Sequence, residues 1–215
     1  YSSFYSHHIC TMEGGVVVTD DQELYEYMLA ARAHGWTRNL PDNSSIYEKK
    51  SDPFYESFNF IIPGFNLRPL EMEGAIGQEQ LKKMDRMISQ RRKNAEYFKS
   101  KMQRFEDIRI QKEIGESSWF GFALLLQGKL KGHRDEIVHA LRENGIETRP
   151  IVAGNFTRNK VIEYMDYSIP EKLAHADDIH FNGFFIGNHS SDNIKEIDYF
   201  IAVLEKAIKE SGIYE

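Results

Sequence analysis

A regular stripe of apolar and small residues between Pro69 and about Gln103 constrains the fold of this chain more than any other feature. Its members recur in steps of four and three, which places them on one face of an α-helix. They are Leu70, Gly74, Gly77, Leu81, Met84, Ile88, Arg91, Ala95, Phe98 and Met102. At ~1.5 Å per residue such a helix would span ~50 Å, more than one compact domain requires. We predict one long helix over 69–103 that joins two domains. A two-stranded coiled coil is less favoured, because glycine is a poor seam residue.

The segments before this helix predict a strand, a helix and a long loop. Three consecutive valines after a Gly-Gly pair predict a strand over 14–19. Asp20 and Asp21 then favour a helix start by complementing its dipole, and the helix is expected to end near Gly35. The stretch 36–64 shows no sustained periodicity, and loops of that length are usually functional or mobile.

The segments after it alternate between strands and helices, which predicts layered α/β structure. The expected strands are 108–111, 119–126, 146–148 and 184–186, with a helix over 134–144 and a terminal helix capped by Ser191. The resulting division is 1–68, the connecting helix 69–103, and a smaller α/β domain over 104–215.

The composition limits the kinds of molecule that this chain can bind and the compartment that it fits. The net charge of −6 argues against a nucleic-acid partner, and no run approaches the ~20 apolar residues of a membrane helix. The single cysteine, Cys10, excludes an intrachain disulfide and fits a reducing cytoplasm. The chain opens at Tyr1, without an initiator methionine and directly inside a motif, so we expect it to be a fragment.

Two adjacent histidines, His7 and His8, precede an acidic-Gly-Gly turn that begins at Glu13. A zinc site is disfavoured, because adjacent histidines point in different directions and no second ligand cluster follows. With an ordinary pKa of ~6.5, a histidine suits a general base at neutral pH. A structural histidine has the same sequence signature, so both interpretations stay open.

Three further clusters have both a structural and a functional interpretation. Gly64-Phe-Asn-Leu-Arg-Pro69 is typical of a helix entry, which spacing alone favours, or of a phosphate site at a helix N-terminus. The segments 147–150 and 154–158 carry arginines beside turn glycines. Such arginines are typical either of a diphosphate-binding site or of a solvated loop. The segment 184–189 indicates a buried strand followed by a polar turn, with His189 at a candidate site.

These four clusters, in this order, resemble the DegT/StrS family of sugar-nucleotide aminotransferases, which have the aspartate-aminotransferase fold. The resemblance covers the whole chain, and family members are roughly twice as long. It implies the C-terminal half of a pyridoxal-phosphate (PLP) transferase fold of the α/β class. Residues 1–68 would end the large PLP-binding domain, and 104–215 would form the small domain.

In this family a Ser-x-x-x-x-Lys pattern supplies the lysine that holds PLP. Counting back from Glu13 places that lysine at His7 and the phosphate-contacting serine at Ser2, with His8 and Ser3 as the alternative pair. No lysine occupies either position. The chain is thereby similar to a subgroup, the PLP-dependent 4-keto-6-deoxy-sugar 3-dehydratases, which carry a His-His pair here.

The resemblance also implies the remaining roles. Asn66 would reach the cofactor phosphate across a homodimer interface, with Arg68 close by, while Arg149, Asn155 and His189 would face a nucleotide-linked keto sugar. The implied function is 3-dehydration of that sugar in surface-polysaccharide biosynthesis, with PLP and its pyridoxamine form (PMP) and glutamate as amino donor. An aminotransferase-like relative and a non-catalytic dimerising or sugar-nucleotide-binding fragment are the alternatives. Family residues that stack on the cofactor ring lie upstream of Tyr1, so we expect this chain alone to be inactive.

Overall fold

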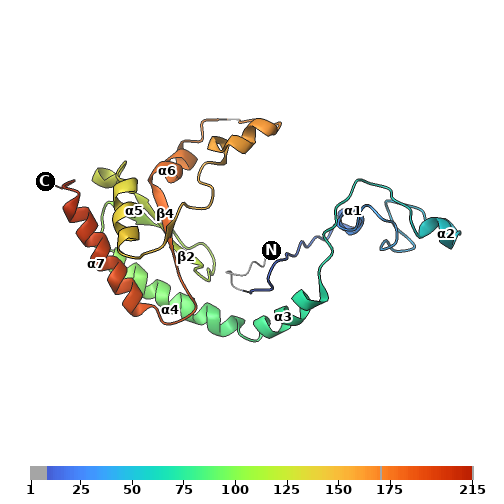
Figure 1. Cartoon of the computed structure of the whole chain (residues 1–215), viewed down its shortest axis with the longest axis horizontal. Coiled ribbons are helices and arrows are strands. Elements are labelled where there is room, and N and C mark those ends of the chain that lie inside the picture. Colours follow the sequence, from blue (N-terminus) through green and yellow to red (C-terminus); the bar gives the residue numbers. More distant parts are fainter. Residues whose placement is uncertain (1–8, 170, 215) are drawn as a thin grey trace. The chain divides into compact units, whose positions relative to one another are not determined.

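The segment expected to form one long helix is two helices in the computed structural model, which describes residues 9–169 and 171–214 (Figure 1). Helix α3 covers Glu71–Leu81 and α4 covers Met84–Met102, with a turn at Lys82 and Lys83 between them. The prediction of an unbroken helix over 69–103 is therefore wrong. Helix α4 buries Ala95, Phe98 and Met102 in a core, whereas α3 buries no residue and contains two glycines, which lower helix stability. The stripe thus belongs to two separate packing environments.

Two units, Tyr1–Lys83 and Met84–Glu215, divide the chain at this same turn. The first contains α1 (Gln22–Ala31), α2 (Pro53–Glu56) and α3. Helix α1 starts where the two aspartates predict, because the Asp21 side chain accepts a hydrogen bond from the Leu24 amide. The prediction of a strand over 14–19 is wrong. Within 14–19 the structure shows a bridge at Gly15 but no strand, and the three valines are exposed.

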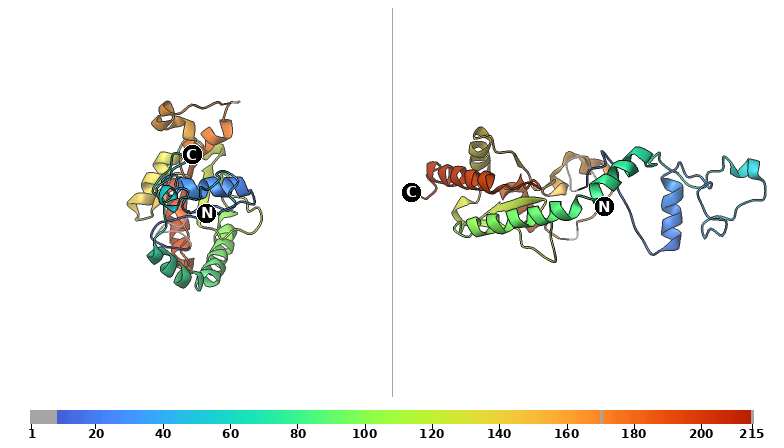
Figure 2. Two further views of the ribbon diagram at one scale, coloured as in Figure 1. Left: turned by 90° about the vertical axis from the view of Figure 1, so that its right-hand side faces the viewer. Right: turned by 90° about the horizontal axis from the view of Figure 1, so that it is seen from below.

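The second unit is built on a four-stranded antiparallel sheet of order β1-β2-β4-β3. Its strands are β1 (Ile108–Ile110), β2 (Gly121–Leu126), β3 (Thr148–Arg149) and β4 (Gly183–Gly187). Helices α4, α5 (Arg134–Glu143) and α7 (Ile194–Glu210) pack with these strands around one core, and α4 and α7 lie side by side (Figure 1, Figure 2). The predicted α/β class is confirmed, and the four strands, α5 and α7 begin and end within about two residues of expectation.

Other parts of this unit were not predicted from the sequence. Helix α6 (Ala174–Asn182) and the 3-10 helices η1 (Gly128–Leu130), η2 (Phe156–Arg158) and η3 (Lys160–Tyr164) fill segments without clear periodicity. The cap of α7 is Asn193 rather than Ser191, whose hydroxyl instead donates to the Asn193 side chain. None of the described helices is long and apolar enough to cross a membrane.

Aromatic stacking joins the helices to the sheet at the centre of this core. The rings of Phe98 on α4 and Phe122 on β2 are parallel with centroids 4.0 Å apart, and Phe200 on α7 lies 6.2 Å from Phe98. Each such side chain is almost completely buried, and burial of one contributes about 1.5–3 kcal/mol. These contacts fix the sheet edges from which the candidate site residues project.

Arg91 on α4 is a charged residue inside this unit, and none of the described residues forms an ion pair with it. It is 5% exposed, and its Nε and Nη1 groups are buried with no hydrogen-bond partner in the described part of the chain. The ring of Phe120 lies 5.8 Å from the guanidinium. Burial lowers the pKa of Arg91, because desolvation penalises the charged form. A buried guanidinium without a partner destabilises a fold.

We therefore predict that Arg91→Met raises the free energy of unfolding of the chain by about 1 kcal/mol or more, since an apolar side chain of similar length removes the desolvation penalty. Arg92→Met is the matched control. Arg92 donates to the backbone oxygens of Ser117 and Glu116, so this substitution should lower stability. Urea unfolding followed by circular dichroism measures both, and equal losses in the two variants would contradict the prediction.

Candidate functional site

The residues predicted for the lysine position lie outside the described residues. These are His7 and His8 as candidate bases and Ser2 as a phosphate contact. Their roles stay predictions. The other predicted site residues are described, and they fall into one group in the first unit and three separate positions in the second.

Asn66 and Arg68 follow a short antiparallel bridge at the end of the long loop. Asn66 pairs with Ala33, and this pairing is held by two backbone hydrogen bonds of 2.8 Å between 32–34 and 65–67. Both side chains are exposed and have no hydrogen-bond or ion-pair partner among the residues that the structure describes. Side chains two residues apart in an extended segment lie on the same side. An amide and a guanidinium on one side of such a segment form a donor set that suits a phosphate group.

Two glycines permit the backbone approach that shapes this bridge. A Cβ atom on Gly35, which has φ +85°, would lie 1.8 Å from the Ile62 carbonyl oxygen. A Cβ atom on Gly64 would lie 2.2 Å from the Gly35 nitrogen. Only glycine fits at both positions, so these residues fix the course of the chain immediately before Asn66.

A buried carboxylate on α1 anchors the loop 36–64. Glu26 is 1% exposed and accepts hydrogen bonds from the Gln22 amide (2.6 Å), the Ser44 hydroxyl (2.7 Å) and the Ser45 backbone amide (2.7 Å). The bonds from Gln22 and Ser44 favour the charged form, and they lower the pKa of Glu26 from 4.5 to about 2. Near neutral pH the loop is therefore attached to α1 through a charged group.

A second carboxylate fastens the other end of the loop. Glu56 accepts hydrogen bonds from the Lys50 backbone amide (2.8 Å), the Tyr47 hydroxyl (2.8 Å) and the Thr37 hydroxyl (3.0 Å). The Lys50 bond is the largest cause of the lowered pKa of Glu56. Burial and the neighbouring Glu56 raise the pKa of Tyr47 to about 12. These contacts disfavour the alternative of a mobile loop, because Glu26 holds its middle to α1 and Glu56 joins three of its segments.

Arg149 lies on β3 and is paired with a neighbour in the chain. Its Nε and Nη2 groups donate to one oxygen of Glu147 at 2.9 and 2.6 Å. Both side chains are exposed. This pair is weak in water, so the guanidinium remains able to exchange Glu147 for another anion.

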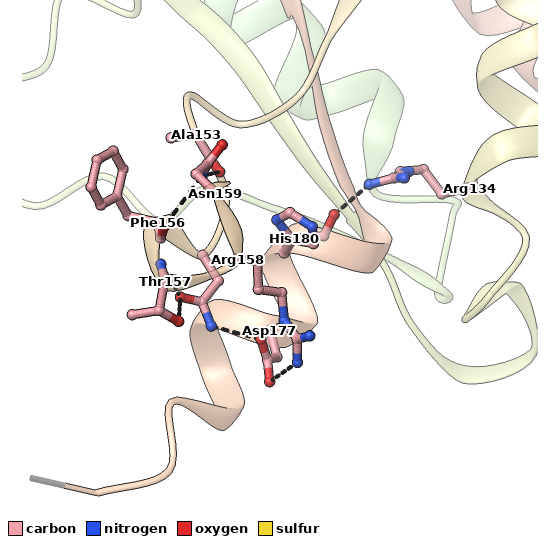
Figure 3. Close-up of polar contacts among 9 residues, drawn as sticks. Arg134, Ala153, Phe156, Thr157, Arg158, Asn159, Asp177 and His180 are labelled. Carbon is pink, nitrogen blue, oxygen red and sulfur yellow. Dashed lines mark hydrogen bonds and ion pairs between the residues drawn. The ribbon is translucent and has the colours of Figure 1, made fainter. Parts of the chain in front are cut away.

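Asn155, predicted to face the sugar, is instead 4% exposed and engaged within the protein. It caps η2 by accepting from the Thr157 amide at 3.1 Å, and its own amide donates to Asp177 at 2.6 Å. Figure 3 shows Arg158 pointing to the same Asp177 on α6, with two contacts of 2.5 and 2.8 Å. The Arg158 bonds, then the Asn155 bond, hold the pKa of Asp177 well below its usual range. As placed here, Asn155 is a positioning residue for this turn.

His189 follows β4 in a turn fixed by side-chain amides. Asn94 on α4 donates to Asn188 (3.0 Å) and to the His189 carbonyl oxygen (3.1 Å), and the His189 ring lies 3.0 Å from the Ser191 hydroxyl. The imidazole is exposed and lines an open groove of about 570 Å³. Glu147, Lys195 and other residues of the strand ends and α7 complete this groove. The structure therefore places His189 in one groove with Glu147, the residue that pairs with Arg149. The described residues contain no group of three or more His, Cys, Asp or Glu able to hold a metal ion.

Comparison with known proteins defines the class. The model of the DegT/DnrJ/EryC1/StrS aminotransferase family matches residues 1–205, and the chain belongs to this family. Its structure matches that of the PseC aminotransferase of Helicobacter pylori with a TM-score of 0.73 at 22% identity, over 94% of this chain and 50% of that one. This likeness establishes the fold, which is the aminotransferase fold expected from the sequence.

More similar relatives share a single name. The GDP-4-keto-6-deoxy-D-mannose 3-dehydratases of Escherichia coli and Yersinia pseudotuberculosis are 52% and 54% identical over 207 and 208 residues, which cover 95% and 96% of this chain. A solved structure of the Escherichia coli enzyme with bound hydrated PLP matches with a TM-score of 0.87 and 52% identity over 94% of this chain and 53% of that one. The chain spans about half the length of the relatives that it matches, 53% for both curated proteins.

One further solved structure bears on the lysine position. It is a variant of the same dehydratase, ColD, in which an adjacent serine and histidine are replaced by asparagine and lysine. It matches with a TM-score of 0.86 and 51% identity, over 94% of this chain and 54% of that one. In the present sequence, Ser6-His7 is the single place where a histidine directly follows a serine.

The Glu26 network generates a pH prediction. The pKa of Glu26 is lower in the folded state than in the unfolded state. The Glu26 carboxylate therefore contributes its full stabilisation above the ordinary pKa of about 4.5, and this stabilisation is lost as the pH falls towards about 2. We expect wild type to exceed Glu26→Gln in urea stability near neutral pH, with the difference shrinking below about pH 4.5. Glu23→Gln, an exposed change on the same helix, is the control. A wild-type advantage that does not change with pH would contradict the assignment.

The Asn155 network generates a local stability prediction. Loss of the cap in Asn155→Ala should speed hydrogen exchange of the 156–159 amides, as expected for about 1 kcal/mol of local destabilisation. Asn159→Ala is the control, because its amide makes only long contacts of 3.5 and 3.4 Å. If Asn155 binds sugar instead of capping, exchange will be unchanged and sugar-nucleotide affinity will fall.

Proposed function

We propose that this chain is the C-terminal half of a PLP- and PMP-dependent enzyme that removes the C3 hydroxyl of a nucleotide-linked 4-keto-6-deoxy sugar. The observation that carries the proposal is the His7-His8 pair, with no lysine nearby, six residues before the acidic-Gly-Gly turn at Glu13, where the family resemblance predicts the lysine. It occurs within a sequence 52–54% identical to GDP-4-keto-6-deoxy-D-mannose 3-dehydratases. A relative named lipopolysaccharide biosynthesis protein RfbH, from Salmonella typhimurium, is 28% identical over 219 residues, which supports a role in surface-polysaccharide biosynthesis.

We assign His7, rather than His8, to the lysine position. The support is the Ser-His order of the replaced pair in the ColD variant, which Ser6-His7 reproduces. Imidazole forms no stable covalent bond with an aldehyde, so the cofactor must be held by contacts alone. The neutral imidazole nitrogen of His7 would accept the proton whose removal accompanies loss of the C3 hydroxyl. His8 and Ser2 would lie beside it.

The described residues fit a cofactor phosphate. Asn66 and Arg68 present unengaged donors on one side of a fixed segment, and both would bind the phosphate, Asn66 across the interface of a homodimer. When bound, the PMP form supplies an amino group and an electron sink, with glutamate as the amino donor. A solved ColD structure with a trapped PLP-glutamate geminal diamine supports glutamate in this role.

The substrate contacts proposed for the second unit are Arg149 and His189. Both are exposed, and Arg149 can exchange Glu147 for a phosphate group. We retain Asn155 as a residue that positions this region, because its amide is occupied. The reaction would take place in the cytoplasm, where a single unpaired cysteine is stable.

Two alternative functions differ from the proposed one in the reaction they would show. An aminotransferase-like protein would transfer an amino group without releasing water from C3. A fragment that only dimerises or binds sugar nucleotide would show neither reaction. A lysine normally moves protons in transamination, and its absence favours dehydration.

The test uses the complete polypeptide that includes this chain, supplied with PLP, glutamate and GDP-4-keto-6-deoxymannose. We predict that His7→Asn lowers kcat for C3 dehydration by about 10²–10⁴-fold, the usual contribution of a positioned general base. His8→Asn, the matched control, should retain activity within about tenfold. His7→Lys should show the absorbance of lysine-linked PLP. A larger loss in His8→Asn would reassign the base, and amino transfer without dehydration would overturn the proposed reaction.

A further inference from the structure

The turn that carries His189, directly after β4, is held by buried side-chain amides. The Asn188 amide donates to the carbonyl oxygens of Arg91 at 3.1 Å and Trp119 at 2.8 Å. The Asn94 amide donates to the carbonyl oxygen of His189 at 3.1 Å. A carbonyl oxygen only accepts hydrogen bonds, so these contacts determine which end of each amide is the nitrogen. The backbone of the turn is thereby attached both to α4 and to the segment before β2.

The side-chain amide of Asn193, the residue before α7, is oriented by the same turn. Its Nδ2 group donates to the His189 carbonyl oxygen at 3.1 Å and lies 3.5 Å from the Asn188 Oδ1 atom. If this amide were reversed, its oxygen would face two other oxygens without a proton to join them. Asn193 Oδ1 is therefore the end that accepts, and it lies 3.0 Å from the Ser191 hydroxyl.

The Ser191 hydroxyl in turn determines the tautomer of His189. Its oxygen lies 3.0 Å from His189 Nδ1 and 3.0 Å from Asn193 Oδ1, and it has a single proton to donate. When that proton goes to Asn193, His189 Nδ1 carries its own proton and donates it to Ser191, so both contacts are hydrogen bonds. When it goes to Nδ1 instead, two oxygens lie 3.0 Å apart with no proton between them. The first arrangement is the stable one, and the neutral ring is the Nδ1–H tautomer.

This tautomer leaves a lone pair on Nε2 of His189. Within the described part of the chain Nε2 makes no hydrogen bond, and the exposed imidazole lines the open groove beside α7. The carboxylates of Glu147 and Glu196 line the same groove, with Lys195 as a cationic neighbour. Carboxylates and an imidazole lone pair accept hydrogen bonds and cannot bind one another, so they select a ligand that carries several donors. Sugar hydroxyl groups meet this requirement, because each has a proton to donate.

We propose that His189 Nε2 accepts a hydrogen bond from a hydroxyl group of the nucleotide-linked sugar, and that Ser191 is the positioning residue that keeps Nε2 an acceptor. The assignment rests on the proposed function and adds the direction of this contact. A ketone oxygen has no proton to donate, so the contact favours a ring carbon with a hydroxyl group over one with a keto group. The imidazole would thus help to orient a sugar that carries both kinds of carbon.

Nitrogen-15 NMR of the 215-residue chain tests the tautomer. The spectrum is recorded at about pH 8.5, well above the ordinary histidine pKa of about 6.5, where protonated and bare ring nitrogens give separate signals. His189 should show a protonated Nδ1 and a bare Nε2, and its signals are identified by their loss in His189→Phe. His139 provides the opposite reference in the same spectrum, because its Nε2 lies 3.2 Å from the Glu143 carboxylate and should carry the proton.

Serine variants separate the positioning role from a general structural one. Ser191→Ala should remove the preference for Nδ1–H, and Ser191→Thr, which keeps a hydroxyl group, should restore it. In the complete polypeptide, Ser191→Ala should raise KM for the sugar nucleotide about threefold to tenfold and leave kcat within about twofold, because one hydrogen bond made in the ground state is weakened. His189→Phe should raise KM about tenfold. Ser190→Ala is the matched control, since this neighbouring serine makes no hydrogen bond to the imidazole among the described residues.

The outcomes distinguish this proposal from the proposed function. A protonated Nε2 in the wild-type chain, or the same tautomer in Ser191→Ala as in wild type, would overturn it. An unchanged KM in His189→Phe, or a loss confined to kcat, would also overturn it. If the complete polypeptide transfers an amino group or shows no turnover, the proposed reaction is refuted. The contact of His189 is then tested by KM for amino transfer or by Kd for the sugar nucleotide, with the same expected ratios between variants.

Discussion

The structure of the first unit depends on two carboxylates, those of Glu26 and Glu56. Among the described residues, neither accepts a hydrogen bond from a cationic side chain. Glu26 and Glu56 accept hydrogen bonds from hydroxyl, amide and backbone groups of a loop that has little apolar packing of its own. A buried carboxylate requires several donors to offset its desolvation, and the loop provides them only in one conformation. The conformation so fixed delivers the chain through the Gly35 and Gly64 contact to Asn66 and Arg68. Candidate phosphate binding thus depends on hydrogen bonds distant from it in the sequence.

Much of the second unit could be predicted from the sequence, because its signals are local. The apolar stripe of the terminal helix and the β-branched and aromatic strand segments each match one periodicity, and burial follows it. Gly145 ends α5 with φ +75°, as a glycine stop should. The prediction of a strand over 14–19 was wrong for a related reason. Strand propensity reports a side-chain surface suited to packing in a sheet, and the valines of this segment are exposed instead.

The candidate site was only partly accessible from sequence. Asn66 and Arg68 were identified through the family resemblance, because spacing alone favoured a plain helix entry there. Asn155 was assigned to the substrate from the family resemblance, whereas in the structure its amide donates to Asp177, 22 residues away on a helix that had no clear periodicity. The stacking of Trp36 on Phe60 went unnoticed for the same reason. Trp36 and Phe60 come together only because a loop closes, and no pattern within either segment indicates the contact.

The broken helix shows what a periodic stripe does and does not report. Its register continues through α3 and α4, but only α4 buries its stripe within the described core. In α3, Leu81 and the capping residue Leu70 stay exposed, although the spacing of four and three is as regular there. Periodicity therefore identifies a face adapted to burial, and it does not identify the segment that buries it. Arg91 occupies a stripe position in α4 and is buried, as the pattern predicts. The pattern does not indicate which group would bind its charge. Hence an apolar period fixes the direction of a helix face with more certainty than the length of the helix.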